Sequence, residues 1–148
     1  GWAQIIRLRQ NRKEDRTMEL QFPFTISVTL LALLVYHSMG FKAGGARVKY
    51  KVDASATDGP DDYRRVYRAH INTLEHLVSF LPAMWIFAVL ISDMWAAALG
   101  LVWTVGRLFY AVGYCKAAEK RVPGLLISFL AVVVLILGSI VSIVMDHI

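Results

Sequence analysis

Charged and amide side chains recur at helical spacing in YRRVYRAHINTLEH (residues 63–76), directly before an uncharged apolar run. On a helix with 3.6 residues per turn, four of them share a stripe narrower than a third of the circumference: Arg64, Arg68, Asn72 and Glu75. Guanidinium groups bind carboxylates and phosphates, preferably through two parallel hydrogen bonds, and a carboxylate binds an ammonium group. This stripe therefore suits an anionic ligand that also carries an amine.

A second set of side chains further along the chain has the same helical spacing. Arg107, Tyr110 and Tyr114 are spaced i, i+3 and i+7, and Arg121 follows another seven residues on. Burying Arg107 inside an apolar run would be costly without a partner. We expect the two stripes to meet in a cationic pocket at one end of neighbouring helices, with Arg47 from the preceding connection within reach.

The side chains of this pocket indicate what it could bind. Several arginines, one glutamate, one asparagine and two tyrosines match a ligand with two carboxylates and an amine. Glutathione has these groups and a thiol, but a phospholipid headgroup or a nucleotide would also engage the arginines. The chain has one cysteine, Cys115, which excludes an intrachain disulfide and a cysteine-based metal cluster, and no metal site is predicted.

Each of these residues also has a plainer interpretation. The arginines at residues 64–68 could anchor lipid phosphates, the two tyrosines could belong to an interfacial aromatic belt, and His70 and His76 could fill the interface. Arg107 and Glu75 could form an ion pair with a purely structural role. The shared face of so many polar residues favours the pocket over these separate explanations.

Long apolar segments must position these residues. The runs cover residues 22–40, 77–91, 94–114 and 123–145, and Arg107 is the one charged residue within them. Crossing the hydrocarbon core takes roughly 20 apolar residues, because a helix rises about 1.5 Å per residue across about 30 Å. The second run reaches this length only if its helix begins near Tyr63. The predicted fold is therefore all-α, an integral membrane bundle of four transmembrane helices, because a β-barrel would show short alternating segments.

Turn signals predict where these helices begin and end. The first helix is expected to end near the glycines at residues 40–45. Asp61 or Asp62 is expected to cap a second helix that extends to about residue 91. The third helix is expected to continue to about Ala118, and Arg121 would stay on its stripe if the helix persisted.

Basic residues outnumber acidic ones by 16 to 11, and most lie between the apolar runs. Residues 42–68 hold seven of them and residues 116–121 hold three, whereas the connection at residues 92–93 holds none. By the positive-inside rule, the two basic connections and the pocket face the cytoplasm of a multi-pass protein, in a bacterial inner membrane or the endoplasmic reticulum. The charge thus indicates membrane orientation and no nucleic-acid partner.

The N-terminal segment departs from this charge pattern. Residues 1–17 carry five basic residues on the side expected to face away from the cytoplasm, and they lack the apolar core of a signal peptide. Met18 could be the first residue of the native chain. We therefore expect residues 1–17 to be a non-native basic extension and residues 18–148 to be a single membrane domain, the alternative being a helix that lies on the headgroups.

In this setting, two motifs resemble those of the MAPEG family, membrane-associated proteins of eicosanoid and glutathione metabolism. Residues 64–75, RRVYRAHINTLE, resemble the family's ERVYRAQxNxxE signature. Residues 106–114, GRLFYAVGY, with Arg121 after them, resemble its ARLxYxxGY segment and the arginine that follows. The resemblance covers nearly everything from Met18 onward. It implies a four-helix bundle assembled as a homotrimer, with glutathione bound between subunits near the cytoplasmic face.

The resemblance also implies roles for individual residues. Arg121 corresponds to the catalytic arginine that stabilises the glutathione thiolate. Arginine suits this role because it stays charged in a partly apolar site, and a cation beside the sulfur favours the nucleophilic thiolate. The residues implied to bind glutathione or to support its site are Arg47, Arg68, His70, Asn72, Glu75, His76, Arg107, Tyr110 and Tyr114.

The implied activity is that of a membrane-bound glutathione transferase or peroxidase, with glutathione as co-substrate. Its partner, a lipophilic electrophile or a lipid hydroperoxide, would arrive through the bilayer. Val122 replaces a serine of the prostaglandin E synthase branch, while Val48 and His76 replace an arginine and a tyrosine of leukotriene C4 synthase. These departures favour a microsomal-type glutathione transferase.

Two alternatives to an enzyme remain open. One is a non-catalytic lipid- or glutathione-binding scaffold that resembles the five-lipoxygenase-activating branch. That branch lacks the arginine corresponding to Arg121, so the presence of Arg121 favours the enzyme. The other is a structural bundle that contacts phospholipids and has no small-molecule site.

Overall fold

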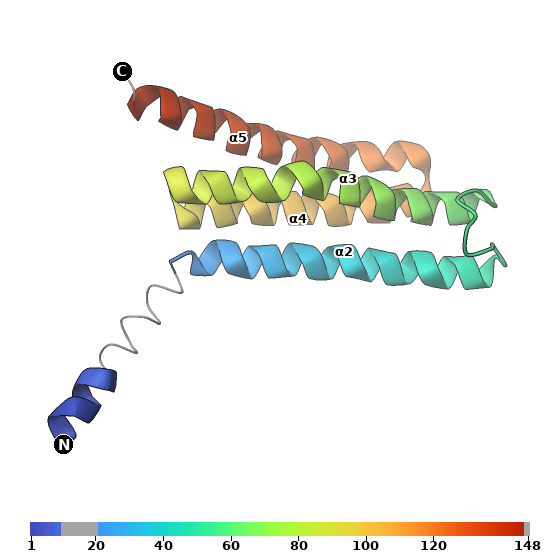
Figure 1. The fold of residues 1–148 in the computed structure, drawn as a ribbon. Coiled ribbons are helices and arrows are strands. Elements are labelled where there is room, and N and C mark those ends of the chain that lie inside the picture. Colours follow the sequence, from blue (N-terminus) through green and yellow to red (C-terminus); the bar gives the residue numbers. More distant parts are fainter. Residues whose placement is uncertain (10–20, 147–148) are drawn as a thin grey trace.

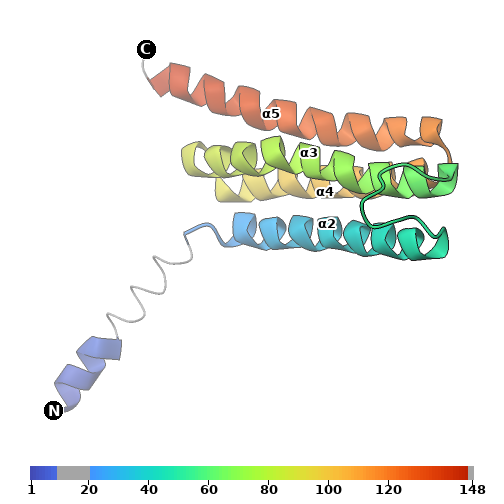
Figure 2. The same ribbon diagram turned by 45° about the vertical axis from the view of Figure 1, so that its right-hand side comes forward.

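The computed structural model describes residues 1–9 and 21–146, and the regular elements in these two ranges are all helical. Residues 2–9 form a short helix, and Met18, where we expect the domain to begin, lies outside the described residues. The long helices are α2 (Pro23–Lys49), α3 (Asp61–Leu90), α4 (Asp93–Lys116) and α5 (Val122–Asp146). The short 3₁₀ helix η1 (Ala118–Arg121) joins α4 to α5. The long helices lie side by side, with α3 and α4 between α2 and α5 (Figures 1 and 2).

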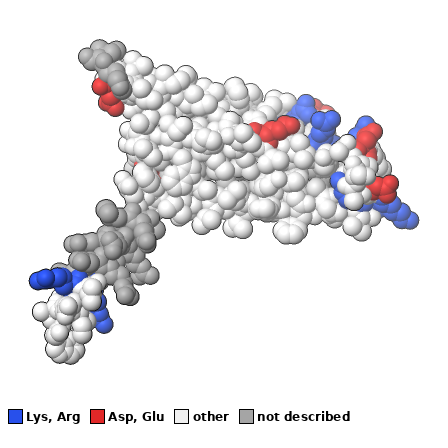
Figure 3. Space-filling view, in the orientation of Figure 1, with Lys and Arg blue, Asp and Glu red and all other residues white. Residues whose placement is uncertain are grey.

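The outer surface of the bundle is apolar along most of its length. Each of the four long helices is long and apolar enough to cross a membrane. Large apolar side chains cover their outer faces: Leu34 is 68% exposed, Phe109 61% and Val141 59%. The charged side chains of the bundle gather mainly at the end where α2 meets α3 and α4 meets α5 (Figure 3). The prediction of an all-α bundle with four helices able to span a membrane is confirmed.

Helix α2 is longer than the sequence predicted. The glycines at residues 40–45 do not end it, and it continues to Lys49. A glycine inside a helix costs only about 1 kcal/mol relative to alanine, which packing against a neighbouring helix can offset. Gly40 serves this packing, because a Cβ atom there would lie 3.2 Å from Nε2 of His70 on α3. The predicted end was wrong because Gly40 allows two helices to approach closely and does not terminate one.

The start of α3 also differs from the prediction. The helix begins at Asp61, Pro60 precedes it, and no side chain caps it by a hydrogen bond. Asp61 and Asp62 lie within the first turn and form ion pairs with Arg64 and Arg65, respectively. Acidic residues in a first turn interact favourably with the partial positive charge at a helix N-terminus. The two aspartates therefore stabilise the start of α3 by charge, not by the predicted capping.

At the opposite end of the bundle, Asp93 joins the start of α4 to the start of α2. Its carboxylate accepts hydrogen bonds from the backbone N–H groups of Phe24 (3.0 Å) and Thr25 (2.8 Å). The first N–H groups of a helix have no partner within the helix and favour a negative charge. Asp93 thus acts as a cap for a helix 68 residues away in the sequence.

Glycines bring α4 and α5 into backbone contact. A Cβ atom on Gly124 would lie 2.1 Å from the backbone nitrogen of Tyr110, and one on Gly106 would lie 2.8 Å from that of Ser128. Small residues at such crossings let membrane helices approach closely. As a result, the first turn of α5 lies directly beside the face of α4 that carries Tyr110.

Candidate functional site

The polar stripes of α3 and α4 meet in a cavity of about 250 Å³. The lining side chains come from α3, from α4 and from the junction of η1 with α5: Asn72, Glu75, His76, Arg107, Tyr110, Arg121 and Leu125. All of them except Leu125 are residues for which the sequence predicted a role in binding or catalysis. The structure therefore brings six of the ten predicted site residues into one cavity.

The side chain of Arg107 is held by Thr73 of α3, a residue that the sequence did not identify as part of the site. Its side chain is fully buried, and Nε and Nη2 donate hydrogen bonds to Oγ1 of Thr73 at 3.2 and 2.8 Å. Within residues 1–9 and 21–146, Arg107 forms no ion pair with Glu75, so the structural pair weighed above is not found there. Among the same residues, Nη1 of Arg107 is a buried donor that has no acceptor. Arg107 therefore has one buried donor that no described residue satisfies.

Thr73 carried little signal in the sequence. It lies about 100° from Asn72 on the helical wheel, so it is off the polar stripe. Its hydroxyl also donates to the backbone carbonyl of Ala69 at 2.8 Å, as threonines in helices commonly do. The one available clue was a hydroxyl on the side of α3 that faces another helix, and threonine occurs there too often for that clue to be specific.

Tyr110 is fixed on two sides. Its ring lies 4.0 Å from Cζ of Arg107, and its hydroxyl oxygen accepts a hydrogen bond from Nδ2 of Asn72 at 2.6 Å. The side chain is only 2% exposed, which argues against an aromatic-belt role. Because Asn72 donates to the oxygen, the hydroxyl proton of Tyr110 remains available to an acceptor in the cavity.

Arg121 reaches the cavity by a turn of the chain and not by continuation of α4. The helix ends at Lys116, and η1 folds back so that Cζ of Arg121 lies 4.8 Å from the centre of the Tyr114 ring. Gly113 allows this return, because a Cβ atom there would lie 2.1 Å from the carbonyl oxygen of Lys120. The third helix was expected to reach about Ala118 and ends two residues earlier, so the helix does not persist to Arg121, which was the condition for this residue to share the stripe by periodicity alone.

A neighbouring pocket of about 420 Å³ extends the polar surface toward the start of α3. Its lining residues are Asp61, Arg64, Arg65, Arg68, Tyr114 and Ala118. Tyr110 lines the first cavity and Tyr114 lines the second, and their ring centroids lie 5.6 Å apart. In the part of the chain that the structure describes, Arg68 forms no ion pair, whereas Arg64 and Arg65 each pair with an aspartate. Arg68 is thus the arginine of this pocket that is free to bind an anion.

Two predicted site residues lie on a different face of the same chain. Arg47 belongs to the last turn of α2, where Nη1 donates to the carbonyl oxygen of Ala56 at 2.9 Å and Cζ lies 5.5 Å from the Tyr63 ring. His70 stacks on Tyr36 at 4.8 Å, on a side of α3 about 160° from the Asn72 position. Within one chain, neither residue lines the two polar cavities.

Most of the chain is similar in sequence to known proteins. Residues 25–141 match the sequence profile of the MAPEG family. The chain belongs to the MAPEG family. The resemblance based on the two motifs is therefore confirmed, and the matched segment includes every predicted site residue from Arg47 to Arg121. MAPEG proteins are integral membrane proteins, in agreement with the four apolar helices.

Individual relatives include one protein without an assigned activity and two named enzymes. The chain is 44% identical to an uncharacterised protein of Synechocystis sp. over 125 residues, which cover 84% of this chain and 90% of the relative. It is 34% identical over 102 residues to microsomal glutathione S-transferase 2 of Homo sapiens, with 69% of each protein covered. It is also 34% identical to leukotriene C4 synthase of Bos taurus over 99 residues, which cover 67% of this chain and 66% of the relative.

Proposed function

We propose that this MAPEG protein is a membrane-bound glutathione transferase that also reduces lipid hydroperoxides. The observation that carries the proposal is the convergence of Arg107, Tyr110, Arg121 and Glu75 in one cavity at the charged end of an apolar bundle. A relative named as a glutathione S-transferase covers more than two thirds of the chain, which supports glutathione as the co-substrate.

The donors and acceptors of the cavity fit the groups of glutathione. Arg107 lines the cavity, and its positive charge would attract one carboxylate of the ligand. Arg68 in the adjoining pocket would bind the second carboxylate, and Glu75 would accept hydrogen bonds from the ammonium group. His76 and Asn72 also line the cavity and would add polar contacts to the ligand.

Arg121 would act on the thiol. An unperturbed thiol has a pKa of about 8.5 and is mostly protonated at neutral pH, whereas a neighbouring guanidinium group favours the thiolate. The proton leaves to water, the thiolate attacks an electrophilic carbon, and the leaving group departs with the bonding electrons. With a hydroperoxide, the thiolate attacks the distal oxygen, the O–O bond breaks, and the lipid alkoxide takes a proton. A second glutathione then converts the resulting sulfenic acid to glutathione disulfide and water.

We further propose a homotrimer in which subunits share the site. Arg68 and Glu75 are exposed on a single chain although lipid would not solvate them, so another protein surface is expected to cover them. Arg47 and His70 lie on the face formed by α2 and α3, and in a cyclic assembly this face would meet the cavity of the next subunit. Glutathione would enter from the cytoplasm, which the charged end is proposed to face.

The catalytic proposal is tested with the purified full chain, glutathione and chlorodinitrobenzene. In Arg121→Ala, we expect the thiolate absorbance to disappear and kcat to fall about 100-fold or more, the usual effect of losing a preorganised stabiliser of negative charge. Lys120→Ala is the matched control, because Lys120 is the neighbouring cation on η1 and does not line the cavity. A parent protein that binds no glutathione would overturn the proposal. Binding without turnover of any electrophile or hydroperoxide would favour the scaffold alternative.

The shared site has its own test. If each site combines Arg47 of one subunit with Glu75 of the next, Arg47→Ala and Glu75→Ala each damage every site of a pure trimer. Co-expression of the two variants would then produce some interfaces with both residues intact. We expect mixed trimers to regain part of the activity, and activity no higher than that of either variant alone would contradict a shared site.

A further inference from the structure

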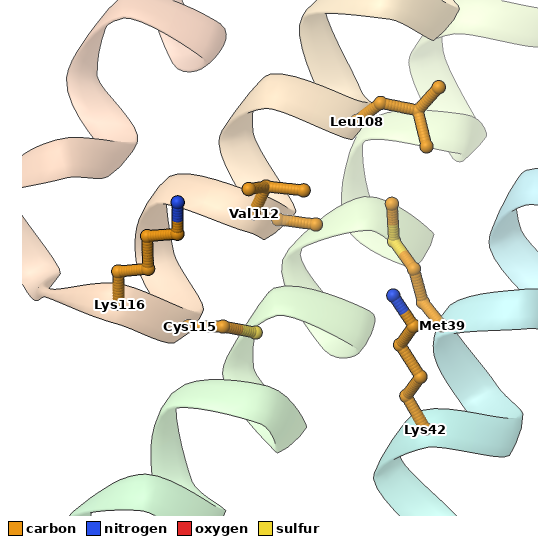
Figure 4. Close-up of a pocket in the computed structure, with 7 residues that line it drawn as sticks. Met39, Lys42, Leu108, Val112, Cys115 and Lys116 are labelled. Atoms are coloured by element: carbon orange, nitrogen blue, oxygen red, sulfur yellow. The ribbon is translucent and has the colours of Figure 1, made fainter.

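A second kind of cavity lies on another side of α4, between α4 and α2. It has a volume of about 270 Å³, and its lining residues are Met39, Lys42, Leu108, Ala111, Val112, Cys115 and Lys116. Figure 4 shows that α2 supplies Met39 and Lys42, while α4 supplies Leu108, Val112, Cys115 and Lys116. We call this cavity the α2–α4 groove. None of its residues lines the two polar cavities.

The body of the groove is apolar and open along its side. Leu108, Val112 and Cys115 recur at helical spacing on α4, about 100° away from the stripe that carries Arg107. Met39 forms a buried part of the lining at 5% exposure, whereas Leu108 and Val112 are 42% and 50% exposed. Both helices are long and apolar enough to cross a membrane, so in a bilayer the open side of the groove would lie beside lipid chains.

The end of the groove is cationic. Lys42 comes from α2, and Lys116 is the last residue of α4, at the end of the bundle where basic residues gather (Figure 3). No acidic side chain lines the groove, and neither lysine forms an ion pair within the described ranges.

We propose that the α2–α4 groove binds an anionic membrane phospholipid. Its phosphate would lie between Lys42 and Lys116, and the first part of an acyl chain would lie against Met39, Leu108 and Val112. Basic pockets between membrane helices at headgroup depth commonly bind anionic lipids in this way. A soluble anion would leave the apolar lining uncovered, and a lipid without net charge would leave the two lysines without a counter-charge. This binding does not depend on the proposed glutathione chemistry.

A lipid in this position would link α2 to α4. Thermal unfolding in a neutral detergent therefore provides one readout, and native mass spectrometry of bound lipid provides another. The probe is phosphatidylglycerol, compared with phosphatidylcholine that has the same acyl chains. We expect phosphatidylglycerol to raise the unfolding midpoint and to remain bound, and phosphatidylcholine to do neither.

Two pairs of variants separate the headgroup from the chain. Lys42→Ala with Lys116→Ala removes the cations, and Lys49→Ala with Lys51→Ala removes two lysines outside the groove at the same end of the bundle. We expect the first double variant to bind phosphatidylglycerol roughly tenfold more weakly, because each lysine near an anionic headgroup contributes to affinity. The control double variant, and a Lys42→Arg, Lys116→Arg variant that keeps both charges, should bind as the parent does.

The apolar part of the groove is tested by filling it. Ala111→Trp places an indole in the lining, and Ala98→Trp places one at an exposed position of α4 outside the groove. We expect the first substitution to weaken phosphatidylglycerol binding by a similar factor and the second to leave it unchanged. Binding that survives Ala111→Trp would overturn the proposal and indicate adsorption by charge alone.

Three further outcomes would also overturn the proposal. They are equal binding of phosphatidylcholine, an equal loss in the control double variant, and displacement of the lipid by glycerol phosphate at similar concentrations. The last result would show that the lysines bind a soluble phosphate and that the apolar lining adds nothing. Unfolding midpoints measured without lipid establish that each variant is folded.

Discussion

The polar cavity and the α2–α4 groove share helix α4 and have similar volumes, about 250 and 270 Å³, but their side chains are held differently. In the polar cavity, Thr73 fixes Arg107 and Asn72 fixes Tyr110 through hydrogen bonds. In the groove, Lys42 and Lys116 form no ion pair in the described part of the chain. Fixed cations can recognise one arrangement of charges, whereas long unpaired lysines suit a headgroup that varies in position.

Depth in the bundle explains this difference. Arg107 is fully buried, so each of its donors needs an acceptor or a ligand, since a buried donor without a partner costs roughly 1–3 kcal/mol. Lys42 and Lys116 are exposed at the charged end, where a lysine can extend its ammonium group into the headgroup region. A cation deep in a membrane helix therefore requires hydrogen-bond acceptors from the protein or a ligand, and a cation near the end of the helix does not.

Gly113→Ala should produce the largest difference between the two sites, because it should slow glutathione conjugation without changing lipid binding. The new Cβ atom would lie 2.1 Å from the carbonyl oxygen of Lys120, so η1 must move and carry Arg121 away from the cavity. We expect the rate of glutathione conjugation to fall about 100-fold or more, because the stabilising charge is displaced. Phosphatidylglycerol binding at the groove should stay unchanged. Steady-state kinetics and lipid titration measure the two effects.

Gly44→Ala is the control for this substitution. It gives the same gain in helix propensity, but no atom lies within 4 Å of its Cβ position. The rate of glutathione conjugation and the affinity for phosphatidylglycerol should both remain as in the parent. Full conjugation activity in Gly113→Ala would show that the position of η1 does not determine the function of Arg121.

Thr73→Val should weaken the polar cavity through Arg107. The substitution keeps the shape of the side chain and removes the acceptor of Nε and Nη2. We expect the free energy of unfolding to fall by about 1–3 kcal/mol and the KM for glutathione to rise, while Thr73→Ser, which keeps the hydroxyl, retains most of both. Unfolding in detergent micelles and kinetics at varied glutathione concentration provide the measurements. Equal effects of valine and serine would indicate that packing, and not the hydrogen bonds, is what matters at this position.

Tyr110→Phe should have the smallest effect. The ring stays beside Arg107, but Asn72 loses its acceptor and the cavity loses a hydroxyl donor. One neutral hydrogen bond contributes about 1 kcal/mol, so we expect conjugation to slow by roughly five- to tenfold and lipid binding to remain unchanged. A loss as large as that of Arg121→Ala would assign the hydroxyl a direct role at the sulfur.

Much of the polar cavity could be predicted because helical periodicity fixes which side chains share a face. The spacing from Asn72 to Glu75 and from Arg107 to Tyr110 survives in the structure, and these residues line one cavity. The same reasoning could not find Thr73, because its importance comes from a residue 34 positions away. It also placed Arg47 near the pocket, whereas within one chain its contacts with Ala56 in the connection and with Tyr63 on α3 keep this residue on another face.

The sequence by itself determined that the chain forms four apolar helices with polar stripes near one end, since apolar length and the 3.6-residue period are local properties. Only the tertiary structure decided that Thr73 and not Glu75 holds Arg107, that η1 returns Arg121 to the cavity, and that Asp93 caps α2. Each of these depends on how closely two helices approach, and the close approach is set by contacts between residues far apart in the chain, such as Gly124 against the backbone of Tyr110.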